Sequence, residues 1–255
     1  MVLVIFLVLA IISIIVMKME FNASFIAKKF KKANCIVFGK KGTGKDLVFQ
    51  KVINKRKRET YFANIPYGKK YNNISLLDVS VYPNTFQDFI EDNIQKINRV
   101  EEREKKDVYI SDGGVYLPSH FDHALSKRYP SMPIYYALSR HLYNSNVHIN
   151  TQALNRIWIK LREQADEYFK TIKTVRIFGL LFTKVRYFEH YEAASKNLLP
   201  MSKKMLNGHQ NALKEQFDST NGKIKDMWIV QRIKKIKYDT RYFRKVFFDK
   251  NIEKE

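Results

Sequence analysis

The residues with the clearest chemical potential form the run GKKGTGKD at positions 39–46. Every position except the last fits the phosphate-binding loop pattern G-x-x-x-x-G-K-[ST], whose final hydroxyl ligates magnesium. In this sequence the last position is a carboxylate, Asp46. Glycines let backbone N–H groups curl around a phosphate, and the ammonium group of Lys45 can reach the β- and γ-oxygens of a triphosphate. The run therefore predicts a nucleotide site that is altered at its magnesium ligand.

The predicted nucleotide contacts come from the loop and from the first turn of the helix that should follow it, whose positive end favours phosphate. They are Gly39, Lys40, Lys41, Gly42, Thr43, Gly44, Lys45, Asp46 and Leu47. The expected cofactors are ATP and Mg²⁺. A chance run of Gly and Lys in a lysine-rich chain is the alternative, and a strand before the loop with a helix after it argues against chance.

A second carboxylate is expected at the end of a neighbouring strand, where it would hold magnesium and its bound waters. The segment VYISD ends in Asp112, so Asp46 and Asp112 are the predicted Mg²⁺ ligands. A strand-ending Asp before a Gly-Gly turn is the simpler alternative. ATPases of the ring-forming kind usually place Glu directly after this Asp to activate water, whereas here Gly113 follows. Either the base comes from elsewhere or hydrolysis is slow.

A further polar group is expected near the γ-phosphate. The segment VHINTQ at 147–152 is typical of a short buried strand with a polar end. If this strand lies beside the strand of Asp112, its last residue, Gln152, would act as a γ-phosphate sensor. An ordinary strand-end hydrogen bond is the alternative.

The elements that must position these residues follow from hydrophobic spacing. Short apolar runs predict strands at 34–39, 60–66, 74–80, 107–111 and 147–152. Periodic apolar residues predict helices after the loop, at 85–106 and 132–144, and at the start of 153–169. A β-hairpin that turns at Phe178-Gly179 follows. Strands alternating with helices through residue 152 indicate a parallel α/β core, to which the hairpin adds antiparallel strands.

Residues 1–17 form an uncharged apolar run. As a helix this run is about 25 Å long, near the lower limit for crossing a bilayer. A cleaved signal peptide would have a basic start and an A-x-A-like cleavage site, and neither is present. A buried core helix would have an amphipathic face, which is also missing. We predict a transmembrane anchor, followed by a basic juxtamembrane segment at 18–33 that lies at the anionic leaflet. Because lysines follow the run and no positive side chain precedes it, the amino terminus is expected outside and the rest in the cytoplasm.

The charge balance points to an anionic partner. Lys and Arg number 46 against 25 Asp and Glu, which gives a formal net charge of +21. Nucleic acid, an acidic membrane surface and nucleotide phosphates all fit this charge. The alternative is a genome biased toward lysine codons, which the many Asn and Ile residues also indicate, and this bias explains part of the positive charge. The single cysteine, Cys35, excludes an intrachain disulfide and fits a reducing compartment.

The order of these segments resembles the zonula occludens toxin-like family, the filamentous-phage assembly ATPases of the FtsK/HerA-type P-loop group. The resemblance rests on GKKGTGKD, YFANIP, VYISD and SRHLYNSNVHINTQ, and it covers residues 34–192. In that family an Arg-His pair precedes a short strand ending in Thr-Gln, and a helix bearing Arg and a β-hairpin follow. Arg140, Gln152 and Arg162 match this layout.

The resemblance implies a RecA/FtsK-like P-loop NTPase domain at 34–192 with helices on both faces of its sheet. The residue pattern beyond it predicts a carboxy-terminal extension at 193–255 of helical linker and basic-aromatic strands. It implies a homo-oligomer, expected to be a ring, in which an arginine completes the neighbour's site. Arg140 and Arg162 are the candidates, and surface or ion-pair roles are the alternative. The implied activity is ATP-driven assembly and extrusion of filamentous virions at the host membrane, with coat or assembly proteins and single-stranded DNA as partners.

The sequence departs from the family pattern at Asp46, at Gly113 and in an anchor that precedes the ATPase domain. The position of the anchor puts a periplasmic carboxy-terminal domain in doubt. Two other functions therefore stay open. One is a DNA-packaging or DNA-translocating ATPase of the same fold, and the other is a nucleotide-gated membrane scaffold without turnover.

Other groupings carry weaker signals. His120 and His123 lie near His141 and His148 in sequence, but surface or packing roles fit them better than a metal cluster without Cys-x-x-Cys. The basic-aromatic stretch RYFRKVFF at 241–248 is a candidate for stacking single-stranded nucleic acid. An amphipathic strand with one solvated face is the slightly better alternative.

Overall fold

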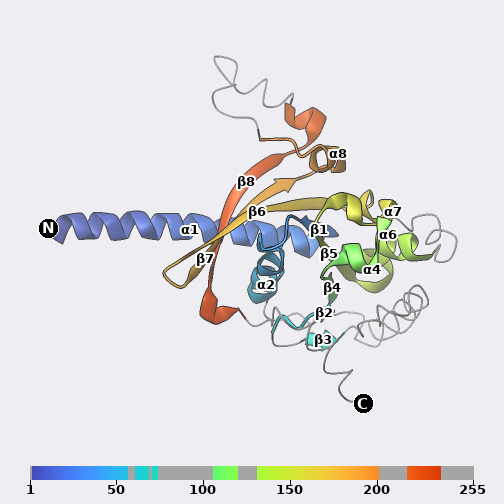
Figure 1. Ribbon diagram of the computed structural model, residues 1–255, viewed down its shortest axis with the longest axis horizontal. Helices are drawn as coiled ribbons and strands as arrows, with labels where there is room; N and C mark the ends of the chain where they lie inside the picture. The colour runs from blue at the N-terminus through green and yellow to red at the C-terminus, as the bar shows by residue number, and fades with distance from the viewer. Residues whose placement is uncertain are drawn as a thin grey trace.

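The computed structural model describes residues 2–56, 61–68, 71–73, 106–119, 131–200 and 217–236. Several predictions of the sequence lie outside these residues: the strand at 74–80, nearly all of the helix at 85–106, His120, His123 and the tail at 241–248. Within the described part, a mixed sheet is flanked by helices, and a long amino-terminal helix extends from it (Figure 1).

In the described part of the chain, eight strands form the sheet in the order β3-β2-β4-β5-β1-β6-β7-β8. Their bounds are β1 Cys35–Phe38, β2 Tyr61–Ala63, β3 Tyr71–Asn73, β4 Lys106–Ile110, β5 Ser145–Thr151, β6 Glu167–Ile177, β7 Leu180–Phe188 and β8 Ile224–Arg232. Neighbouring strands from β3 to β6 run parallel, and β6, β7 and β8 run antiparallel. Strand β5 therefore lies between the strand that leads into the loop and the strand that leads to Asp112.

Helices cover both faces of the sheet. Their bounds are α1 Val2–Lys32, α2 Lys45–Lys55, α4 Gly113–Tyr116, α6 Ser131–Tyr143, α7 Ile159–Arg162 and α8 Tyr191–Ser195, with 3₁₀ turns η3 Leu154–Arg156 and η5 Ile233–Lys235. Alternate residues of a strand point to opposite faces. Accordingly, Val37 lies in the core shared with α1 and α2, and Ile36 lies in the core shared with α6, α7 and α8. The predicted α/β sheet with an added antiparallel hairpin is confirmed.

Helix α1 does not end where the apolar run ends. It continues without interruption to Lys32, because no Gly or Pro breaks it and apolar side chains recur at helical spacing in its second half. Those buried against the sheet are Ala23, Ile26, Ala27 and Phe30, whereas residues 3–15 are exposed. The basic stretch 18–33 was expected to lie at the leaflet. In the structure it is instead part of a helix whose apolar side packs on the sheet.

Polar contacts also hold the second half of α1 to the body of the molecule. Glu20 pairs with Lys51 of α2 at 2.5 Å, and Lys29 pairs with Glu167 of β6 at 2.6 Å. By length and composition, the helix Leu3–Lys32 can cross a membrane. Its first half thus carries exposed apolar surface, and its second half packs on the sheet.

The helix predicted at the start of 153–169 is broken in the structure. Only η3 and the four-residue α7 are helical there. The intervening Ile157 pairs with Pro118 as an isolated bridge, and the Trp158 N–H donates to Leu117 O at 2.8 Å. These tertiary contacts keep the backbone extended between the two short turns.

The hairpin turns at Phe178-Gly179 as predicted, with φ of 44° and 76° at the two turn residues. Strand β8 then pairs with β7, with Met227 opposite Val185. The start of β8 falls in the polar stretch 193–226, for which the sequence predicted only a linker with helical pieces. A short alternating pattern flanked by lysines is a weak signal until a neighbouring strand pairs with it.

Candidate nucleotide-binding site

The phosphate loop lies between the carboxyl end of β1 and the amino end of α2. The Gly39 N–H donates to Thr151 O at 3.2 Å, which joins the start of the loop to the end of β5. Gly42 and Gly44 have φ of 80° and 93°, in the left-handed region that favours glycine. A Cβ on Gly44 would also clash with Thr174 of the hairpin. The glycines are therefore required by the path of the backbone and by the space beside it.

Threonines of the hairpin support the loop from one side. The Oγ1 atoms of Thr171 and Thr43 lie 2.7 Å apart, and Thr174 Oγ1 donates to Thr43 O at 2.9 Å. Thr183 of β7 shares a hydrogen bond of 2.9 Å with Thr174. This support could not be predicted from the sequence, because it depends on β6 lying directly beside β1.

Lys45 is buried beneath the loop. Its ammonium group donates to Gly39 O at 3.0 Å and to Lys40 O at 3.3 Å. Burial lowers the pKa of Lys45, and the charges of Asp46 and Asp112 act in the opposite direction. The ammonium group is thus held by neutral carbonyl groups, which are weaker acceptors than an anionic phosphate.

Asp46 occupies the position that a Ser or Thr hydroxyl takes in other phosphate loops. Its carboxylate accepts hydrogen bonds from three surrounding side chains. Its Oδ1 accepts from Tyr67 Oη at 2.7 Å, Ser111 Oγ at 2.7 Å and Asn150 Nδ2 at 2.8 Å. The hydroxyl groups of Tyr67 and Ser111 also contact each other. We call Tyr67, Ser111 and Asn150 the Asp46 cage. These residues were not among the predicted site residues, and the available signal was the polar Ser111 at the end of an otherwise apolar strand.

Asp112 follows β4 directly, and its N–H donates to Asn150 Oδ1 at 2.9 Å. Burial raises the pKa of the Asp112 carboxyl, and the charge of Asp46 raises it further, whereas Lys45 and Lys41 oppose both. The structure therefore brings together the two predicted metal ligands and the loop lysine. A cation between the two carboxylates would relieve the burial of like charges.

The residue after Asp112 must be small. A Cβ on Gly113 would clash with the side chain of Ile149 in β5. Helix α4 begins at Gly113 and packs directly on β5, so a glutamate at this position would require a shift of the backbone or of Ile149. Close packing against β5 thus accompanies the departure from the family pattern at this position.

Gln152 lies just after β5, and its side chain is exposed. Its Oε1 accepts from Arg156 Nη1 at 2.9 Å. The β5 side chain that reaches the Asp46 carboxylate is Asn150, two residues earlier. Gln152 borders the pocket beside the loop, so its role as a sensor stays a prediction.

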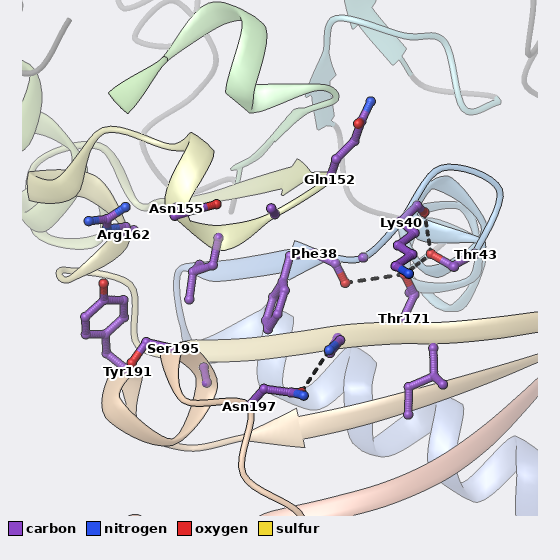
Figure 2. A pocket seen from close by; sticks show the side chains of 16 residues that line it. Phe38, Lys40, Thr43, Gln152, Asn155, Arg162, Thr171, Tyr191, Ser195 and Asn197 are labelled. Carbon is purple, nitrogen blue, oxygen red and sulfur yellow. Dashed lines mark hydrogen bonds between the residues drawn. The ribbon is translucent and has the colours of Figure 1, made fainter. Parts of the chain in front are cut away.

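A pocket of about 660 Å³ opens beside the loop. Lys40 and Thr43 of the loop line one end, and Arg162 and Tyr191 lie at the other (Figure 2). Among the side chains that line it, Lys40, Arg162 and Lys170 are cationic and none is acidic. Burial lowers the pKa of Lys170, and the charges of Arg186 and Lys40 lower it further. A lining of this kind favours an anionic ligand.

The two predicted arginines lie in different places. The Nε of Arg162 is buried and has no hydrogen-bond partner in the described part of the chain. Arg140 donates to Lys32 O at 2.6 Å and lies 3.7 Å from Asp166. Lys32 precedes β1 whereas the loop follows β1, so Arg140 lies at the opposite edge of the sheet. The structure brings Arg162, and not Arg140, to the pocket of the same chain.

In the part of the chain that the structure describes, no group of three or more His, Cys, Asp or Glu side chains is arranged to hold a metal ion. His148 is buried beneath the rings of Phe30 and Tyr109. For this histidine the packing role is therefore the better description.

No protein-family model matches this chain, and no curated protein matches it in sequence. Among solved structures, it is similar to the N-terminal domain of zonular occludens toxin from Neisseria meningitidis, with 14% identity, a TM-score of 0.45 and coverage of 68% of this chain and 96% of that chain. It is also similar to the genome packaging NTPase B204 from Sulfolobus turreted icosahedral virus 2 in complex with ATP-gammaS, with 10% identity, a TM-score of 0.43 and coverage of 82% and 96%. The DNA-packaging ATPase B204 from Sulfolobus turreted icosahedral virus matches at 12% identity, with a TM-score of 0.40 and coverage of 81% and 95%.

Since these identities and TM-scores are low, the fold is assigned from the chain's own features. The loop lies between β1 and α2, and Asp112 lies at the end of β4. Strand β5 separates β1 from β4 in the sheet. Loop and carboxylate thus meet at the carboxyl edge of parallel strands, as in the P-loop NTPase fold.

Proposed function

We propose that this chain is a membrane-anchored ATPase whose catalytic site is the phosphate loop. The observation that carries the proposal is the buried ammonium group of Lys45, held by loop carbonyls beside two carboxylates that act on its charge. Lys45 would bind the β- and γ-phosphates. Asp112 and the second carboxylate oxygen of Asp46 would bind Mg²⁺, which prefers hard oxygen ligands.

The pocket beside the loop supports a place for the rest of the nucleotide. Phe38 and Tyr191 offer ring surface on which a base and a ribose would pack. The guanidinium group of Arg162, which lines the pocket, would donate to the base or the ribose. Lys40 would add positive charge at the phosphate end.

We expect hydrolysis to be slow. Gly113 leaves the usual position of the water-activating carboxylate empty of a side chain. The Asp46 cage offers hydroxyl and amide groups, which are poor bases at neutral pH. Turnover should therefore lie well below about 10 s⁻¹, a typical enzyme rate.

For the biological role we propose assembly and extrusion of filamentous virions, on the strength of the sequence resemblance and the exposed apolar half of α1. The anchor would cross the host membrane with the amino terminus outside, and cytoplasmic ATPase domains would form a ring. Coat protein or single-stranded DNA would be the moved substrate. The net charge of +21 also favours the second candidate, a DNA-packaging or DNA-translocating ATPase.

ATP binding and hydrolysis by the full chain in bilayer nanodiscs test the proposal. We expect Mg²⁺-dependent binding and slow turnover, both lost in Lys45→Ala and kept in Lys223→Ala, an exposed lysine outside the loop. Stimulation by DNA would favour translocation, and stimulation by coat protein would favour assembly. ATP binding without hydrolysis would favour the nucleotide-gated membrane scaffold. Normal ATP binding by Lys45→Ala would mean that the loop is not a phosphate site.

A further inference from the structure

We infer that the tip of the β6–β7 hairpin, residues 175–182, is a second membrane contact that inserts into the interface of an anionic bilayer beside α1. This inference rests on the membrane anchoring in the proposed function. The tip is apolar where a hairpin turn in water is usually polar. Phe178 is fully exposed at 101%, and Ile177 and Val175 are 46% and 38% exposed. Single exposed apolar residues are ordinary, but a group of them on one projecting turn marks an interaction site.

The turn residue is costly for a protein surrounded by water. Phe178 has a φ of 44°, in the left-handed region that bulky side chains avoid. Asn-Gly or Asp-Gly would form the same turn without this strain. Strained residues of this kind persist where their side chain has a function. Transfer of an exposed aromatic ring from water to the lipid interface would supply such a function.

Contacts between α1 and β8 set the depth of the tip. Asn22 Nδ2 donates to Trp228 O at 3.0 Å, and Trp228 lies opposite Lys184 in the sheet. From Lys184 the strand advances about 13 Å to the turn. About nine residues of α1 span the same length, so a strand parallel to the helix would reach the level of Ser13 inside the apolar run, and the angle between hairpin and helix (Figure 1) makes this the upper limit. Figure 1 shows the hairpin and the exposed half of α1 extending from the body toward the same side.

The expected depth matches an interfacial segment. Lys18, the first charged residue after the apolar run, lies about 6 Å from Asn22 along the helix. The tip therefore passes the level of Lys18 by at most roughly 7 Å, within the depth at which amphipathic segments bury their apolar side at the boundary of headgroups and acyl chains.

The charge around the tip fits anionic lipid headgroups. Between Thr171 and Lys184 the chain contains Lys173 and Arg176 and no acidic residue. Arg232 of β8 lies opposite Leu180 at the turn. Long basic side chains can reach the headgroups while their apolar neighbours lie deeper. The tip is apolar, basic side chains surround it, and it extends to the same side as the apolar half of α1. These three features favour a lipid bilayer as the partner of the tip.

Depth measurements on the full chain test this inference. In a Cys35→Ala background, an NBD fluorophore is attached at Phe178→Cys, and the protein is reconstituted in phosphatidylcholine–phosphatidylglycerol vesicles with or without brominated acyl chains. We expect blue-shifted emission and roughly twofold quenching by the brominated lipid, because the tip lies at acyl-boundary depth. Leu199→Cys, 66% exposed and beyond the other end of β7, is the matched control and should show neither. Ile12→Cys reports on the anchor itself.

A Phe178 label as accessible to aqueous iodide as the Leu199 label would overturn the inference, and a quenched Ile12 label would then leave the proposed anchor standing. A Phe178 label shielded from iodide but not quenched by brominated lipid would mean that a second copy or another protein covers the tip, which also overturns it. As a second variant, Phe178→Asn suits the left-handed turn and should keep the thermal stability in detergent. It should also reduce the lipid quenching of a label at Val175→Cys, and unchanged quenching would contradict a lipid role for the ring.

Discussion

At the residue scale, the carboxylate at position 46 changes the chemistry expected of a phosphate loop. A hydroxyl at this position is neutral, whereas Asp46 brings a negative charge toward the phosphates. At an effective dielectric constant near 20, unit charges about 4 Å apart interact by roughly 4 kcal/mol. Mg²⁺ and Lys45 are the positive charges expected closest to this carboxylate and the phosphates, so nucleotide binding should depend strongly on the metal.

Replacing Asp46 by Ser separates these effects. We expect Asp46→Ser to bind ATP at least about tenfold more tightly in EDTA, because the repulsion is removed. With Mg²⁺ it should hydrolyse ATP at least as fast as the wild type. Its free energy of unfolding should fall by about 1–3 kcal/mol, because the Asp46 cage loses its shared acceptor. Titration of a fluorescent nucleotide, single-turnover hydrolysis and thermal unfolding measure the three quantities.

The matched control is Asn150→Ala, which removes one donor of the cage and keeps the carboxylate. It should lose stability without gaining metal-free affinity. If Asp46→Ser keeps its fold and loses activity with Mg²⁺, the carboxylate is an essential ligand or base and this account of Asp46 is wrong.

Restoring the family glutamate should not restore fast hydrolysis. In Gly113→Glu the new Cβ would clash with Ile149, and overpacking of this kind costs about 1–3 kcal/mol. Val115→Glu, at a half-exposed position of the same short helix, should change stability by less than about 0.5 kcal/mol. Thermal unfolding of the two variants measures this difference in stability. A stable Gly113→Glu variant with faster turnover would contradict the packing explanation.

At the scale of elements, the second half of α1 is part of the core. The ring of Phe30 is buried between Phe49, Phe169 and His148. Phe30→Ala should therefore lower the free energy of unfolding by about 3–5 kcal/mol. Phe21→Ala, on the same helix but 79% exposed, should have little effect in detergent. Equal stability of the two variants would mean that α1 does not pack on the sheet in solution.

The pairing of β7 with β8 should depend on pH through Asp226. Arg186 binds this carboxylate at 2.6 and 3.1 Å, and Lys184 lies 3.0 Å away. Burial alone would raise the pKa of Asp226, but the hydrogen bonds and charges of Arg186 and Lys184 outweigh it and lower the pKa. A carboxyl whose pKa is lower in the folded state stabilises the fold above its unfolded pKa, and this contribution is lost as the pH falls through the folded pKa.

Asp226→Asn should consequently unfold at a lower temperature than the wild type at neutral pH, by an amount equivalent to roughly 1 kcal/mol. The difference should shrink as the pH falls below about 4. Thermal unfolding across pH measures it, with the exposed Glu163→Gln as control. A difference that stays constant into acid would show that Asp226 acts through packing and not through its charge.

At the scale of the whole molecule, α1 gives the domain a defined orientation if it is anchored. Because the lysines of α1 follow its apolar half, the sheet and the loop should lie in the cytoplasm. A reporter fused to the carboxy terminus should be active only as a cytoplasmic reporter, and Leu199→Cys should resist an impermeant thiol reagent in intact cells. Labelling of Leu199→Cys from outside would reverse the orientation.

Features that depend on neighbours along the chain could be predicted from the amino-acid sequence. The glycine spacing of the loop, the carboxylate at the end of the VYISD strand and the turn at Phe178-Gly179 are local in this sense, as is the apolar run before Lys18. Local backbone preference and periodic burial leave their pattern in consecutive residues, so these predictions needed no knowledge of the strand order.

Contacts between residues that are distant along the chain became visible in the folded arrangement. Tyr67, Ser111 and Asn150 converge on Asp46 because β2, β4 and β5 are neighbours in the sheet. The same strand order presses α4 against β5, and the packing of α1 turns a basic stretch into part of the core. Contacts between elements follow from how side chains fill the space between layers, and residue spacing along the chain does not encode that.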